Sequence, residues 1–131
     1  MRYQEKIAHA RARFSSIEEW IEDVDDLKTK LATYKATQEF IEVLTDLSAM
    51  IIKDSDNVAR DDYKNFTTLK SLEIITGDQE KSLREANGLR NRLTHYYNGI
   101  VDEIAIDSFQ RMAPKLMEIL GVFETWIGKL E

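Results

Sequence analysis

Apolar residues recur every three or four positions along most of this chain. This spacing puts their side chains on one face of an α-helix, because the helix has about 3.6 residues per turn. Five such stretches can be followed, at residues 3–24, 27–51, 63–75, 83–96 and 102–130. The connections between them are short, and short connections join antiparallel neighbours in helical bundles. The sequence therefore predicts an all-α, up-and-down bundle of about five helices.

Few residues in the chain interrupt helices, since there are one proline and five glycines among 131 residues. This length, with 43% hydrophobic content, is enough for one packed core, so we expect a single domain over residues 1–131. The proline, Pro114, lies inside the fifth stretch and removes one backbone donor there. We expect it to kink or break the last helix near residues 112–113.

The first stretch contains an internal helix-start signal. The segment Ser15-Ser16-Ile17-Glu18-Glu19 fits a capping box, in which a serine and a glutamate satisfy backbone groups at a helix N-terminus. The apolar pattern nevertheless continues across this segment. A single long first helix is therefore favoured, and two shorter helices are the alternative.

Polar residues and glycines mark the other expected helix ends. The aspartates within residues 23–26 should start the second helix, because acidic residues favour a helix N-terminus. Gly77 should end the third helix in a left-handed conformation, and Asp78 should cap the fourth. The pair at residues 98–99, Asn-Gly, should end the fourth helix, and Asp102 should cap the fifth.

Composition excludes several kinds of chemistry. The chain has no cysteine, which rules out disulfides, thiolate catalysis and cysteine-bound metal sites. Its net charge of −6 argues against a protein that holds long nucleic acid by charge alone, so any RNA contact should be local or completed by a partner. We find no apolar leader and no apolar run approaching the ~20 residues that span a bilayer. We therefore expect a cytoplasmic protein with no membrane contact.

One segment, residues 89–97, combines side chains suited to a phosphate. It reads LRNRLTHYY, and its hydrogen-bond donors are nearly uninterrupted in an otherwise acidic chain. On a helical wheel, Arg90 and Tyr97 fall at the edge of the core-facing stripe, whereas His95 lies about 140° away from Arg90. Asn91 shares the outer face with His95. A histidine near an arginine on a helix is most often part of a solvated face, and the density of donors is what favours a phosphate site here.

The spacing of Arg90-Asn91, His95 and Tyr97 resembles the R-x4-H-x-Y signature of the HepT toxins, within the HEPN ribonuclease superfamily. The residues at 62–66, DYKNF, also resemble that family's layout, and the likeness extends over nearly the whole chain. The resemblance implies a HEPN-like helical fold. It also implies the toxin half of a toxin–antitoxin module, whose partner is an MntA-like nucleotidyltransferase antitoxin.

By this resemblance, the protein is an endoribonuclease that needs no metal and no cofactor. A base must take the proton of the ribose 2′-hydroxyl so that this oxygen can attack the adjacent phosphate, and an imidazole suits this task, which makes His95 the candidate. Arg90 would stabilise the charge that develops on the phosphate oxygens. Asn91 and Tyr97 are the supporting residues, through hydrogen bonds or by orienting the imidazole.

This scheme also needs an acid, and the only other histidine, His9, is expected to be an ordinary residue of the first helix. A twofold homodimer would resolve the shortage, because two copies of the fourth helix would bring two sets of Arg90 and His95 into one cleft. HEPN proteins are known for this arrangement. The resemblance also makes Tyr97 the residue that the partner modifies by AMPylation.

Two other functions stay open at the level of sequence. The same donors could belong to a catalytically silent HEPN module that dimerises and binds a nucleotidyltransferase or a nucleotide. The chain could also be a helical scaffold without a ligand. The joint presence of Arg90, His95 and Tyr97 favours the endoribonuclease.

Overall fold

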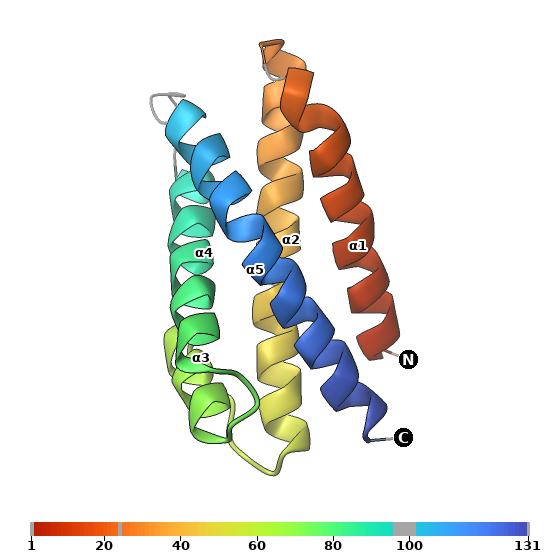
Figure 1. Cartoon of the computed structure of the whole chain (residues 1–131), viewed down its shortest axis with the longest axis vertical. Coiled ribbons are helices and arrows are strands. Elements are labelled where there is room, and N and C mark those ends of the chain that lie inside the picture. The colour runs from red at the N-terminus through yellow and green to blue at the C-terminus, as the bar shows by residue number, and fades with distance from the viewer. Residues whose placement is uncertain (1, 24, 96–101, 131) are drawn as a thin grey trace.

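Five α-helices make up the fold of the computed structural model, which describes residues 2–23, 25–95 and 102–130. They are α1 (Arg2–Trp20), α2 (Leu27–Asp54), α3 (Asp62–Ser71), α4 (Gly77–His95) and α5 (Asp102–Gly128), and a 3-10 turn, η1 (Ile21–Asp23), follows α1. No strand occurs among these residues, and no helix within them has the length and apolar character needed to cross a membrane. Figure 1 shows α1, α2, α4 and α5 along the long axis of the molecule, with the short α3 beside the start of α4. The predicted all-α bundle of five helices is confirmed.

The central helix is α2, which contacts each of the other four. Its Phe40 is fully buried between Phe14 of α1 and Phe109 of α5, with ring centroids 5.5 and 6.1 Å away. The rest of its inward face consists of large apolar side chains: Ile41, Leu44, Leu47, Ile51 and Ile52. One continuous core therefore joins all the helices that surround the predicted active segment.

The first apolar positions of α2 are an exception to this burial. Leu27 and Leu31 are 66% and 57% exposed. Helical periodicity shows which face of a helix is apolar, but it does not show how far along that face a neighbouring helix extends. The apolar stripe of α2 is therefore longer than its buried face.

The continuity of α1 and the start of α2 both agree with the sequence. Helix α1 runs without a break through Ser15 and Ser16, and the Ser16 hydroxyl donates to the carbonyl of Ala12 at 3.1 Å instead of capping a new helix. Helix α2 begins after Asp26, whose carboxylate accepts a hydrogen bond from the Thr29 backbone N–H at 3.0 Å. The single first helix and the aspartate start of the second are both confirmed.

The predicted end of the third helix is wrong. Helix α3 ends at Ser71, and the residue with a left-handed backbone is Glu73, at φ 60°, rather than Gly77. The N–H of Ile74 then donates to the carbonyl of Leu69 at 3.0 Å, the bond that closes a Schellman motif. Gly77 is instead the first residue of α4, so this glycine begins the fourth helix and does not end the third.

The predicted cap of the fourth helix is also wrong. The Thr76 hydroxyl accepts from the N–H of Gln79 at 3.1 Å, and the Gln79 side chain accepts from the N–H of Thr76 at 2.9 Å. This reciprocal pair is a capping box. Asp78 lies inside the first turn and pairs with Lys115 of α5 at 3.3 Å. The acidic residue thus helps to join α4 to α5 rather than to start α4.

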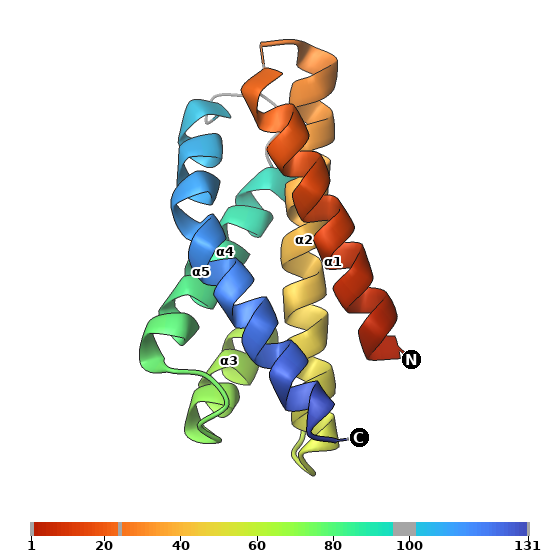
Figure 2. The same ribbon diagram turned by 45° about the vertical axis from the view of Figure 1, so that its right-hand side comes forward.

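The last helix, α5, is continuous across Pro114. Figure 2 shows it changing direction partway along its length, so of the two expected outcomes the helix kinks and does not break. Asp102 is the first residue of α5 rather than the residue before it. The expected end of the fourth helix at residues 98–99 lies outside the described residues.

Candidate active site

Helix α4 carries residues 89–95 of the predicted active segment and packs against α2, α3 and α5. Its Leu83, Ala86 and Leu89 are buried in the core. The next residue, Arg90, has a side chain that is 24% exposed. Arg90 therefore lies at the border between the core and the surface, as the helical wheel predicts.

The Arg90 guanidinium is held between two carboxylates from other helices. One terminal nitrogen, Nη1, lies 3.7 Å from Oε1 of Glu42 on α2. The other, Nη2, lies 3.6 Å from Oδ2 of Asp62, the first residue of α3. Nη2 also donates to Oδ1 of Asn91 at 3.2 Å. Three helices therefore meet at this guanidinium.

Among the described residues, few acceptors lie within hydrogen-bond distance of the Arg90 guanidinium. A guanidinium has five N–H donors, and the two carboxylates lie beyond the 2.7–3.2 Å range of ordinary N–H···O hydrogen bonds. Within the described part of the chain, Nε of Arg90 is buried and has no hydrogen-bond acceptor. The carboxylates thus fix the cation by charge while leaving donors for a phosphate.

Of the other predicted site residues, Asn91 lies beside Arg90 and His95 does not. Asn91 is half-buried and accepts the Arg90 hydrogen bond, whereas His95 is exposed in the last described turn of α4. Because α4 is continuous between the two, five residues of helix turn His95 about 140° away from Arg90. Among the predicted site residues that the structure describes, Arg90 and Asn91 alone lie together within one chain. Tyr97 lies outside the described residues.

A threonine between Arg90 and His95 ties this end of α4 to α2. The Thr94 hydroxyl donates to the carbonyl of Arg90 at 2.9 Å and accepts from Nε2 of Gln38 at 2.8 Å. The bond from α2 resists rotation of α4 about its own axis. It therefore helps to fix the direction in which both Arg90 and His95 point.

Sequence reasoning missed the two carboxylates, Glu42 and Asp62, that flank Arg90. Glu42 lies on the partly exposed face of α2, where a glutamate is unremarkable, and Asp62 follows an aspartate with an ordinary capping role. The only available signal was that Asp62 opens the DYKNF segment that resembles the HepT layout. That signal placed Asp62 in the family pattern but not beside Arg90.

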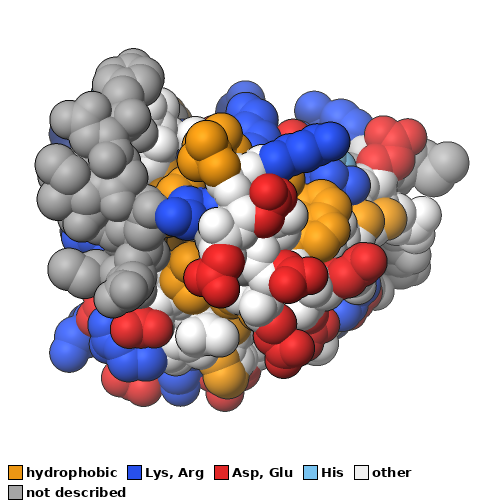
Figure 3. Space-filling view, turned by 90° about the horizontal axis from the view of Figure 1, so that it is seen from above, with side chains coloured by type: hydrophobic (Ala, Val, Ile, Leu, Met, Phe, Trp, Pro, Cys, Tyr) orange, Lys and Arg blue, Asp and Glu red, His pale blue; other side chains and the backbone are white. Residues whose placement is uncertain are grey.

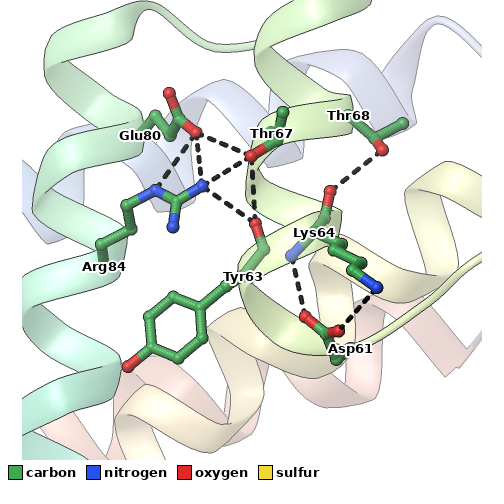
Figure 4. A network of polar contacts seen from close by, with 7 residues as sticks. All are labelled: Asp61, Tyr63, Lys64, Thr67, Thr68, Glu80 and Arg84. Carbon is green, nitrogen blue, oxygen red and sulfur yellow. Dashed lines mark hydrogen bonds and ion pairs between the residues drawn. The ribbon is translucent and has the colours of Figure 1, made fainter.

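A network centred on Arg84 fixes α3 against α4 (Figure 4). Its guanidinium donates to the Tyr63 carbonyl at 3.2 Å, to Oγ1 of Thr67 at 2.6 Å and to Oε2 of Glu80 at 2.9 Å. It also lies 5.6 Å from the centre of the Tyr63 ring. The Arg84 hydrogen bond lowers the pKa of Glu80 below its ordinary value. Arg84 therefore joins α4 to α3.

Replacing Arg84 by methionine is expected to loosen α3. The substitution keeps an unbranched stem over the Tyr63 ring but removes every hydrogen bond, and for a partly exposed arginine we expect a loss of about 1 kcal/mol in unfolding free energy. Amide hydrogen exchange should speed up selectively in α3. The matched control is Arg111→Met, since Arg111 is exposed and its one hydrogen bond within the described residues is a long contact of 3.4 Å to Ser108. Equal exchange rates in α3 for both variants would contradict the role of Arg84.

The surface at the end of the bundle where α4 stops and α5 begins has mixed charge. Figure 3 views this end and shows acidic and basic side chains interspersed, with hydrophobic side chains between them. A broad basic surface of the kind that binds long nucleic acid is not seen on the described part of this face. The arrangement agrees with the net charge of −6.

Comparison with known proteins supports one family. The family model described as Ribonuclease HepT-like matches residues 3–122. A protein of Archaeoglobus fulgidus named as a candidate RNase is 33% identical over an alignment of 133 residues, which covers 99% of this chain and 96% of that protein. A second candidate RNase of the same organism is 32% identical over 121 residues, 86% of this chain and 89% of its own length.

The fold is also that of solved toxin structures. A tri-AMPylated HEPN toxin of Shewanella oneidensis, in complex with MNT antitoxin, superposes with a TM-score of 0.84 at 20% identity and covers 94% of this chain and 96% of its own. A toxin–antitoxin structure with AMP-PNP gives a TM-score of 0.83 at 19% identity over 92% of this chain and 96% of that one. The family match over most of the chain and the identity to full-length relatives agree with this fold. The chain belongs to the HepT-like ribonuclease family.

Proposed function

We propose that this protein is the toxin of a toxin–antitoxin module and that it cuts RNA as a metal-independent endoribonuclease in a cleft between two copies of the chain. The observation that carries the proposal is the Arg90 guanidinium, which is held by groups from three helices, is 24% exposed, and has few hydrogen-bond acceptors among the described residues. A preorganised cation of this kind stabilises charge that develops on phosphate oxygens.

The proposed reaction begins at His95. Its imidazole takes the proton of a ribose 2′-hydroxyl, and the oxygen attacks the adjacent phosphorus while Arg90 stabilises the charge on the non-bridging oxygens. The bond from phosphorus to the 5′-oxygen then breaks, and that oxygen takes a proton from an acid. The products are a 2′,3′-cyclic phosphate and a free 5′-hydroxyl, and no metal takes part.

A dimer supplies the groups that one chain lacks. His95 and Arg90 point in different directions from one helix, so a second copy of α4 is the simplest way to bring an exposed imidazole opposite a guanidinium. The second His95 in such a cleft would serve as the acid. The site residues proposed for each cleft are Arg90, His95 and Asn91, with Tyr97 in support.

We further propose an MntA-like nucleotidyltransferase as the partner, with Tyr97 as the residue that it AMPylates. The solved proteins of this fold include a toxin–antitoxin complex whose toxin is tri-AMPylated. Added phosphate groups next to Arg90 and His95 would occupy the donors that the RNA phosphate needs. Modification would therefore block the reaction.

Mixing two inactive variants tests the shared cleft. Neither Arg90→Ala nor His95→Ala should cleave RNA alone, but a mixture that exchanges subunits should recover cleavage, because half of the dimers are mixed and each of these joins one intact Arg90 to one intact His95. The recovered rate should stay below a quarter of the wild-type rate, because the mixed dimers lack the second His95 that serves as the acid. Initial rates on a short single-stranded RNA in the presence of a chelator measure this. No recovery, with exchange shown by mass spectrometry of differently labelled chains, would contradict a cleft built from two copies.

The silent HEPN module remains the competing function. RNA cleavage and nucleotide binding, both measured on the wild type, separate it from the enzyme. A wild-type protein that cleaves none of the RNAs, yet binds a nucleotide in a way that depends on Arg90, would support the module. Cleavage by the wild type alone supports the enzyme.

A further inference from the structure

The two carboxylates beside Arg90 have no part in the reaction proposed above. Glu42 and Asp62 come from different helices, and their side chains are 44% and 36% exposed. Each lies near a different terminal nitrogen of the same guanidinium, at 3.7 and 3.6 Å. A flat group held by charge at both of its terminal nitrogens cannot swing towards either side without losing one attraction. The pair therefore sets the orientation of Arg90.

The backbone that presents Asp62 is itself held in place. Asn65 is buried, and its side chain accepts from the N–H of Arg60 at 2.7 Å and donates to the carbonyl of Arg60 at 3.1 Å. Asp61 caps α3 by accepting from the N–H of Lys64 at 3.0 Å (Figure 4). These bonds fix the residues on both sides of Asp62.

Glu42 is presented by an equally rigid element. Its neighbours along α2, Ile41 and Val43, are buried in the core, so the backbone cannot shift without disturbing that packing. Both carboxylates thus belong to fixed parts of the fold. Exposed ion pairs add little to stability, so this arrangement has its main effect on the geometry of Arg90.

We propose that Glu42 and Asp62 are positioning residues that hold the Arg90 guanidinium in the orientation in which it meets the RNA phosphate. This inference rests on the proposed endoribonuclease function. Two carboxylates beside one cation leave a local excess of one negative charge, which weakens the attraction for a phosphate. The pair therefore gives a better aligned transition state in exchange for weaker substrate binding.

This exchange predicts that kcat and KM both fall, a combination that loss of folding would not produce. In Glu42→Gln and in Asp62→Asn, kcat should fall about tenfold. Displacing a catalytic group by 1 Å can cost ~100-fold in rate, and the carboxylate that remains should keep the shift of Arg90 smaller than this. KM should fall as well, because one negative charge has been removed near the phosphate site. Glu42→Asp, which keeps the charge, should recover most of the lost kcat.

The matched control is Asp46→Asn. Asp46 lies one turn further along α2, is 54% exposed and pairs with Lys6 at 3.0 Å, away from Arg90. This substitution removes the same unit of charge from the same helix. Both kcat and KM should stay within twofold of the wild type. A fall in kcat as large as that of Glu42→Gln would overturn the proposal, since charge in general rather than this pair would then be responsible.

A measurement that needs no cleavage tests the positioning directly. In ¹⁵N NMR spectra, rotation about the Nε–Cζ bond of Arg90 should be slow in the wild type and at least several-fold faster in Glu42→Gln and Asp62→Asn. Arg84, which has its own partners, should not change and is the internal control. Unchanged rotation of Arg90 in both variants would overturn the positioning role even if the enzyme cleaves RNA. Faster rotation in a protein that cleaves no RNA would support the role while the proposed reaction fails.

Discussion

Replacing His95 by alanine is expected to slow RNA cleavage about 10²–10⁴-fold, the usual contribution of a positioned general base. His95 is exposed in the last described turn of α4, so its removal should leave the fold intact, with the unfolding free energy changing by no more than about 0.5 kcal/mol. The lost rate would therefore come from chemistry. Initial rates on a short RNA, with a chelator present and the cyclic phosphate product identified by mass spectrometry, give the measurement.

The other histidine supplies the control for this experiment. His9 is also exposed, but it lies on α1, and His9→Ala should cleave at the wild-type rate. In bacteria, expression of the wild type and of His9→Ala should stop growth, whereas expression of His95→Ala should not. Normal growth of the cells that express the wild type, equal to that of the cells that express His95→Ala, would rule out the toxin function.

Replacing Phe40 by alanine is expected to remove about 3–5 kcal/mol of unfolding free energy. Phe40 is fully buried in α2, and its ring touches aromatic rings from α1 and α5. Three packed helices surround this ring, and they cannot all move into the vacated space. The cost of the remaining cavity therefore adds to the lost free energy of burying the ring. Urea unfolding followed by circular dichroism measures the change, read as a shift in midpoint at constant slope.

Leu27→Ala is the control for Phe40→Ala. Leu27 belongs to the same helix and is also large and apolar, but it is 66% exposed, so the expected loss is below about 0.5 kcal/mol. Equal losses in the two variants would mean that α2 is not the centre of the core. A large loss for Leu27→Ala alone would point instead to an interface that covers its exposed face.

The sequence predicted what depends on neighbouring residues along the chain. Helix number, the continuity of α1 and the border position of Arg90 all follow from a spacing of three and four, because one helix turn brings those residues together. Glu42 and Asp62 did not follow, because their place beside Arg90 depends on how α2, α3 and α4 pack. A partner far along the sequence leaves no mark in local periodicity.

The helix ends between α3 and α4 show a different limit. Thr76 and Asp78 are both acceptable capping residues, and the local rule cannot choose between them. The structure uses Thr76, because Gln79 returns its hydrogen bond and because Lys115 of α5 pairs with Asp78. Glu73 takes the left-handed position although a glycine lies four residues later, because the bond from Ile74 to Leu69 already closes the helix there.

The three-helix origin of the Arg90 site has a consequence for the cell that makes this protein. Residues 42 and 62 leave the ribosome before residue 90, and they reach the guanidinium only once α4 has docked on α2 and α3. A growing chain therefore carries the arginine without its alignment, and a chain that unfolds loses that alignment at once. If the protein is the toxin proposed above, it would endanger the host only after α4 has been made and has docked, which leaves that interval for an antitoxin to be made.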